Sequence, residues 1–295
     1  MLNISLLEQL SLDTYVDRLK LNEVEEGYEK LLELKDYLFE QRIELAKQKV
    51  SNYWTAQDLD KDLKSLKDGK AKDAHGHTYE LFKHAGKDLK HSLLQLFNLI
   101  KKKQVYPSIL QPSNISSFWK LKGEKSDLNN DRGVFNVVKL RSILDKLIYN
   151  DIYEKVDESM SCSNIGARKN RNIRDHLFVV NAIVNDVVKN KKKVDIEIYD
   201  VQKCFDKMSF KETANDMFKA GVNDDKFVLL ANSNRVSKVA VKTPWGSLTE
   251  RVDIKEIEMQ GTVLVPLKCS TQIDSIGKGC FETTDRLLKY KECVL

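Results

Sequence analysis

The stretch that decides the fold is Val194-Asp195-Ile196-Glu197-Ile198-Tyr199-Asp200. Its apolar residues alternate with acidic ones, which is the period of a strand with one buried face. The chain continues as Val201-Gln202-Lys203-Cys204-Phe205-Asp206, so a carboxylate, Asp200, ends the strand and an aromatic side chain follows five residues later. Taken alone the pattern is weak, because an aspartate at a strand end more often caps a turn. Asp206 is more often structural than catalytic.

A second segment downstream strengthens the functional interpretation of the segment around Asp200. Gln260-Gly261-Thr262 runs on to Pro266-Leu267 and supplies a side-chain amide beside a glycine. Glycine lets a backbone or a ligand approach closely because it has no Cβ. A lone carboxylate at a strand end suits Mg²⁺, which takes few protein ligands and completes its octahedron with water and phosphate oxygens. Asp200 is therefore a candidate metal ligand.

Upstream of these segments the chain reads mostly as helices. Apolar residues recur at helical spacing through the first fifty residues, and a capping box at Thr55-Ala56-Gln57-Asp58 begins a helix that we expect to end at Gly69. Further apolar faces predict three more helices: Leu89, Leu93, Leu96 and Ile100; Leu140, Leu144, Leu147 and Ile148 (about Val137 to Tyr153); and Leu177, Val180, Val184 and Val187. Strands are expected around Ile115–Lys122. The order predicts an α/β (α+β) fold, helical first and then mixed.

Charge is unevenly distributed along the chain. The net charge is +5, yet residues 1–50 hold 7 Lys/Arg against 11 Asp/Glu, so the remainder, with 42 against 33, carries +9. Lys101-Lys102-Lys103 and Lys191-Lys192-Lys193 are the densest basic runs. A solvated surface explains either run alone, but the excess over the whole later segment favours a polyanionic partner.

Composition also bounds the compartment. No apolar stretch reaches membrane-spanning length, so we expect no transmembrane helix and no membrane partner. The first residues lack the pattern of a secretory signal, and the five cysteines show no CxxC or Cys/His finger spacing. We expect free thiols and an intracellular location, cytoplasmic or nuclear. His75 and His77 lie two residues apart without further ligands nearby, so a metal site there is not expected.

Five segments in order give the chain a family resemblance. Besides the two described above, they are Leu66-Lys67-Asp68-Gly69-Lys70-Ala71 with Asp73, Gly76, Glu80 and Phe82-Lys83; Lys120-Leu121-Lys122-Gly123 with Asp127 to Gly133; and Ile165-Gly166-Ala167-Arg168-Lys169-Asn170-Arg171 with Asp175 to Phe178. From about Ser51 onward the chain resembles the reverse transcriptases of non-LTR retrotransposons. The resemblance implies a helical extension (residues 1–50), a helix-rich fingers region (51–190) and a partial palm (191–295).

The resemblance also implies roles for particular residues. Asp200, with the carbonyl of Val201, would hold Mg²⁺, and Phe205 would lie under the incoming sugar. Lys120 or Lys122 and Arg132 would bind the triphosphate of a dNTP, and Gln260 would contact nucleotide and template. Arg168, Arg171 and Gly261 would contact the template. The implied partners are an RNA template and a DNA primer.

The sequence departs from the family pattern at two points. Leu121 stands where a glycine is usual in the fingers hairpin. A paired-aspartate turn should follow Pro266-Leu267, but the one adjacent pair, Asp224-Asp225, lies upstream and is expected to lead into a helix. We therefore expect little or no polymerase activity from residues 1–295. An open sheet edge beside the Asp200 strand would favour self-association, and we expect the region from Cys269 to Leu295 to be poorly anchored.

Three interpretations remain open at this stage. The chain is a reverse transcriptase fragment, a nucleic-acid-binding remnant without catalysis, or a helical interaction or scaffold protein built around residues 1–50. The first two differ in metal dependence, and the third would ignore RNA.

Overall fold

A computed structural model describes residues 24–124, 130–193, 208–233, 237–243, 247–254 and 261–292, with side chains from 29 to 278 apart from that of Ile254. The chain divides into two compact units between Glu44 and Leu45. The first unit is described from Val24 and contains most of α3 (Val24–Lys47), the helix expected in the first fifty residues. Everything below concerns the second unit.

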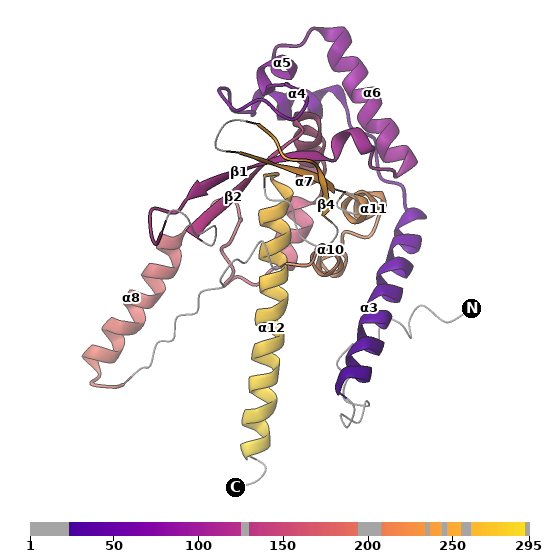
Figure 1. Cartoon of the computed structure of the whole chain (residues 1–295). Coiled ribbons are helices and arrows are strands. Elements are labelled where there is room, and N and C mark those ends of the chain that lie inside the picture. The colour runs from indigo at the N-terminus through magenta and orange to yellow at the C-terminus, as the bar shows by residue number, and fades with distance from the viewer. Residues whose placement is uncertain are drawn as a thin grey trace. The chain divides into compact units, whose positions relative to one another are not determined.

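The second unit is a mixed assembly of helices and one sheet (Figure 1), as the α/β expectation required. Its helices are α4 (Ala56–Lys64), α5 (Tyr79–Lys83), α6 (Lys87–Lys103), η1 (Ser108–Leu110), α7 (Lys139–Ser159), α8 (Ile173–Lys189), α10 (Phe210–Lys219), α11 (Asp225–Asn232) and α12 (Leu264–Glu292). Its strands are β1 (Pro112–Trp119), β2 (Asp131–Val137), β3 (Ser237–Lys242) and β4 (Val252–Ile254).

The sheet joins segments that are far apart in the sequence. Its order is β2-β1-β3-β4, with β1 antiparallel to β2, parallel to β3, and β3 antiparallel to β4. The parallel pair places Pro112–Ser116 beside Lys238–Lys242, so one strand comes from the expected fingers range and the other from the expected palm range. Phe135, Val137, Val239 and the half-buried Ile115 pack together on one face of the sheet.

The helices that cover this core follow the apolar spacing of the sequence. α7 is almost wholly buried through its middle, including Leu144, Leu147 and Ile148. It packs against α4 and α12, and α12 packs most extensively against α10 (Figure 1). Asp224 caps the first turn of α11 by accepting a hydrogen bond from the Lys226 amide. The expectation that the Asp224-Asp225 pair leads into a helix is therefore confirmed.

Two helix expectations were wrong in detail. α4 ends at Lys64 rather than Gly69, because the Ser65 hydroxyl donates to the Asp62 carbonyl and competes with the next helical turn. In α6 the buried stripe is Leu93, Phe97 and Ile100, whereas Leu89 and Leu96 are exposed. The stripe is displaced because the Phe97 side chain, fully buried, takes the central position.

The C-terminal region also differs from expectation. The first half of α12 is firmly packed, with Leu264, Leu267, Cys269, Thr271 and Asp274 all buried. Poor anchoring from Cys269 onward is therefore wrong for the part up to Asp274. By contrast, none of the residues of α8 is buried, although its apolar spacing was recognised. The open sheet edge that we expected beside Asp200 lies outside the described residues.

The capping box of α4 provides the first testable prediction. The Thr55 hydroxyl accepts from the Asp58 amide, and the Asp58 carboxylate accepts from the Thr55 amide at 2.8 Å. Thr55→Ala should lower the free energy of unfolding by about 1 kcal/mol, measured by urea titration. Thr55→Ser keeps the oxygen and serves as the control. Equal stability of the two variants would contradict this account of the helix start.

Candidate nucleic-acid interface

The hairpin of β1 and β2 carries the first group of candidate residues. Phe118 pairs with Arg132 and Trp119 with Asp131, and the Lys120 amide donates to the Asn130 carbonyl at 2.8 Å. The pairing therefore brings Lys120 and Arg132 to the same end of the hairpin, with Lys122 in the turn beyond. Lys122 and Arg132 are exposed, and Lys120 is half-buried. Three cations thus gather at one end of a rigid two-stranded element.

The turn itself has an unusual backbone. Leu121 has φ 59° and Gly123 has φ 71°, both in the left-handed region. Glycine adopts this region freely, whereas a side chain there costs about 1–2 kcal/mol. A Cβ at Gly123 would collide with the side-chain amide of Asn130. Leu121, which the resemblance identified as a departure from glycine, therefore occupies a position whose geometry favours glycine, with its side chain 80% exposed.

The segment from Leu66 to Lys83, which we call the entry segment, is tied to the point where β2 ends and α7 begins by one buried carboxylate. Asp73 accepts hydrogen bonds from the amides of His75, His77 and Lys139, the last at 2.7 Å. The Asn136 side chain donates to the Lys72 carbonyl beside it. The two histidines therefore shape a loop around Asp73. Across the described residues, no cluster of three or more His, Cys, Asp or Glu side chains has metal-binding geometry.

Gly261 owes its identity to a contact with β2. Its φ is 127°, and a Cβ there would stand 2.6 Å from the Phe135 carbonyl oxygen. Any larger residue would push against main-chain atoms, which cannot move aside as a flexible side chain can. The close approach expected at this glycine is thus an approach to the hairpin, and a template contact stays a prediction. The contact places the start of α12 directly against the strand that carries Arg132.

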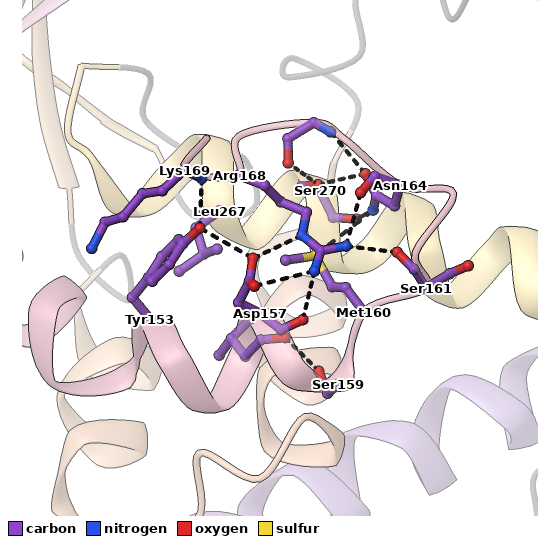
Figure 2. A network of polar contacts seen from close by, with 12 residues as sticks. Tyr153, Asp157, Ser159, Met160, Ser161, Asn164, Arg168, Lys169, Leu267 and Ser270 are labelled. Carbon is purple, nitrogen blue, oxygen red and sulfur yellow. Dashed lines mark hydrogen bonds and ion pairs between the residues drawn. The ribbon is translucent and has the colours of Figure 1, made fainter. Parts of the chain in front are cut away.

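Arg168 lies at the centre of a polar network between α7 and the following loop (Figure 2). Its Nε donates to Asp157 Oδ1 at 2.7 Å, and its Nη2 donates to Asp157 Oδ2 and to the Asp157 carbonyl. Its Nη1 donates to the carbonyls of Ser161 and Asn164 at 2.7 and 3.0 Å. All five guanidinium hydrogens are therefore used within the protein. This geometry favours a role in holding the loop; the template contact expected of Arg168 would require breaking these bonds.

The same loop is also fastened to α12 (Figure 2). The Ser270 hydroxyl donates to the Gly166 carbonyl at 2.6 Å, and the Asn164 side-chain amide donates to the Ser270 carbonyl at 3.0 Å. The Ser161 amide donates to Asp274 at 2.9 Å. Residues 161–169, which we call the Arg168 loop, are thus held between the end of α7 and the start of α12.

The cations that follow Arg168 are placed differently. The Lys169 amide donates to the Tyr153 hydroxyl at 2.6 Å, and its ammonium lies 4.0 Å from the Tyr153 ring centre. Burial raises the pKa of the neighbouring Tyr149 to about 12. Arg171 is exposed and forms no hydrogen bond or ion pair within the described part of the chain. Of the two arginines assigned to the template, Arg171 is the one whose side chain is accessible.

A buried ionic group on α7 joins Asp145 to Arg141 and to Tyr106. The Tyr106 hydroxyl donates to Asp145 at 2.9 Å, and Arg141 Nε lies 3.6 Å from the same carboxylate. Burial raises the pKa of Asp145, and Arg141 opposes that rise. Sequence reasoning missed Asp145, Arg141 and Asp157 as members of the site. The four-residue spacing of Arg141 and Asp145 on one predicted helix was the available signal.

The remaining candidates, Asp200, Val201, Phe205 and Gln260, lie outside the described residues, as does the strand expected to end at Asp200. The assignment of Mg²⁺ to Asp200 and Val201 is therefore still a prediction from the sequence. What the structure does bring together is the entry segment, the hairpin, the Arg168 loop and the glycine of the Gln260-Gly261 pair.

Comparison with known proteins adds no identification. No family model matches the chain, and no curated protein sequence matches it. Among the described residues, no helix has the length and apolarity needed to cross a membrane.

Gly261→Ala should be strongly destabilising. The left-handed backbone and the clash with the Phe135 carbonyl together predict a loss of about 2–4 kcal/mol in the free energy of unfolding. Gly277→Ala is the matched control, because Gly277 lies in α12 with no atom near the added Cβ. That control should raise stability by up to about 1 kcal/mol. Similar effects in chemical denaturation would contradict the proposed contact.

Asp157→Asn tests the Arg168 network through its pH dependence. The hydrogen bond from Arg168 holds the pKa of Asp157 below its usual range. A lowered folded-state pKa means that the carboxylate stabilises the fold above its unfolded pKa, roughly 3.9, and loses this effect as pH falls through the folded value. At pH 7 the variant should be less stable by about 2 kcal/mol.

The difference between the wild type and Asp157→Asn should shrink as the pH is lowered below about 4. Glu158→Gln, on the exposed neighbouring residue, provides the control and should show neither effect. A pH-independent loss of stability in Asp157→Asn would count against the charged pair.

Proposed function

We propose that this chain is a reverse-transcriptase-type protein whose second unit contains the nucleotide- and template-binding fingers. The observation that supports the proposal most is the meeting of four motif segments in one body. The entry segment joins the end of β2 through Asp73, and Gly261 packs on the same strand. The Arg168 loop is fastened to the helix that Gly261 precedes. Segments recognised separately in the sequence are thus neighbours, as parts of one site must be.

The hairpin end suits a triphosphate. Lys120, Lys122 and Arg132 are cationic donors, and charge-assisted hydrogen bonds to phosphate oxygens are stronger than neutral ones. Arg132 projects from β2, and Lys120 and Lys122 lie in the turn that follows β1. Arg171 is a further exposed cation, in the segment that follows Arg168. RNA template, DNA primer and dNTP are the ligands that we propose for this surface.

The catalytic part of the proposal rests on Asp200 and Val201. Mg²⁺ bound there would supply charge stabilisation for attack of a primer 3′-hydroxyl on a dNTP. The fingers residues do not take part in that step; they bind and orient the triphosphate and the template. Binding can therefore be tested separately from catalysis.

A non-catalytic nucleic-acid-binding role is the second candidate. It is favoured because the segments expected in the fingers region are held together by hydrogen bonds and packing contacts with one another and with α12. The two candidates differ in how they respond to Asp200→Ala. Mg²⁺-dependent retention of dNTP that Asp200→Ala abolishes supports the polymerase type. Unchanged RNA affinity in that variant, together with no Mg²⁺-dependent dNTP binding in the wild type, supports the second.

The triple variant Lys120→Gln, Lys122→Gln, Arg132→Gln tests the binding surface. Removing three phosphate contacts should lower affinity for a primer–template and reduce the slope of log K against log salt by about 2–3. The control replaces three exposed lysines of α6, Lys87, Lys102 and Lys103, with glutamine. Fluorescence anisotropy over a salt series measures both. Equal losses in the two triple variants would show that only net charge matters.

A further inference from the structure

One face of the sheet is separate from its core. Residues that pair across neighbouring strands lie on the same face, and the opposite face holds the apolar core of Ile115, Phe135, Val137 and Val239. The face that lies opposite this core is formed by Asn114, Ser116 and Phe118 of β1, Arg132, Val134 and Asn136 of β2, and Lys238, Ala240 and Lys242 of β3. It spans β2, β1 and β3, in which β1 pairs with both of the others.

Toward the hairpin end this face is open. Phe118 is 58% exposed and Val134 is 43% exposed. Arg132 is the direct cross-strand partner of Phe118 and is also exposed. Phe118 and Val134 therefore form an exposed apolar patch beside a cation.

The charges around the ring favour one kind of occupant. Within the nine residues listed above, the face has three cations and no carboxylate. Lys242 lies across from Ser116 on the other side of β1 from Arg132. Because adjacent strands are about 4.8 Å apart, β1 with its aromatic ring is flanked on both sides by strands that present a cation. No ion pair to Arg132 or Lys242 is formed by the described residues.

This combination matches an unpaired nucleic-acid strand. Bases stack on an aromatic ring while cations beside it follow the phosphate backbone, and stacking is tolerant of sequence because every base has a π-face. A duplex has no free base face to offer to Phe118. A protein partner would meet the lysines Lys238 and Lys242 on this face, and lysine is depleted from protein–protein interfaces.

We propose that Phe118, with Arg132 and Lys242, forms a platform that binds single-stranded RNA or DNA by base stacking, without sequence preference and without metal. The platform rests on the proposed function in that nucleic acid is its ligand. It adds a contact made by the sheet face that lies opposite the apolar core, separate from the turn residues Lys120 and Lys122.

The test uses the full chain and a fluorescein-labelled oligouridylate of about 20 nucleotides, with no Mg²⁺ and no dNTP. Phe118→Ala should weaken binding about tenfold, since stacking of one base accounts for a change of this order. The salt slope should stay unchanged, because no charge is lost. Phe118→Trp should retain the affinity. Tyr53→Ala, at a tyrosine 51% exposed outside the sheet, is the matched control and should have no effect.

Lys242→Gln separates the electrostatic part. It should lower the salt slope by about 0.7, the value for one phosphate contact on a single strand. An oligodeoxythymidylate of the same length distinguishes RNA from DNA, and similar affinities are expected because stacking does not require a 2′-hydroxyl. A blunt duplex should compete at least tenfold less well, since its bases cannot reach the ring.

Each contrary result has a distinct meaning. Unchanged binding in Phe118→Ala, while the hairpin triple variant loses affinity, overturns the platform and leaves the proposed function standing. Absence of any nucleic-acid binding by the wild type overturns both. Loss of a dimer in light scattering on Phe118→Ala would show that the face joins two copies of the chain, and this also overturns the platform.

Discussion

The parallel pairing of β1 with β3 is the constraint on which the rest of the second unit depends. Pro112–Ser116 lies beside Lys238–Lys242, so the chain must leave the hairpin and return in the same direction. Parallel strands require a long crossover connection, here made through α7, α8, α10 and α11. Once β3 is in place, the chain can deliver Gly261 against Phe135 and start α12 beside the loop that follows α7. The hairpin, the glycine and the Arg168 loop are neighbours because of this one pairing.

Local features of this arrangement could be predicted from the sequence. Thr55 and Asp58 form the expected capping box, Asp224 begins a helix, and Leu144 to Ile148 turn inward on α7. Each depends on residues within a few positions of one another. The predicted end of α4 was wrong because the Ser65 hydroxyl donates to the carbonyl of Asp62 in the helix. Helix propensity does not reveal this hydrogen bond. The buried face predicted for α6 was wrong because the face that a helix buries depends on the elements that pack against it.

The long-range features could not be predicted in the same way. Arg168 was recognised as a functional cation, yet its five hydrogen bonds are to Asp157 and to carbonyls of its own loop, which no spacing encodes. Gly261 was expected to approach a ligand, whereas its close neighbour is a strand more than a hundred residues upstream. In both cases residue type indicated the constraint, and only the fold identified the partner. Arg168 therefore holds the segment that leads to Arg171, and Gly261 packs against the strand that carries Arg132.

The most direct test of the central claim is a hydrogen–deuterium exchange footprint of the full chain, with and without an RNA template annealed to a DNA primer. The account predicts slower amide exchange at the end of the hairpin, in residues 117–122 and 131–134, and in the loop around Arg171. Protection confined to α3, or no protection anywhere in the second unit at saturating nucleic acid, would contradict it.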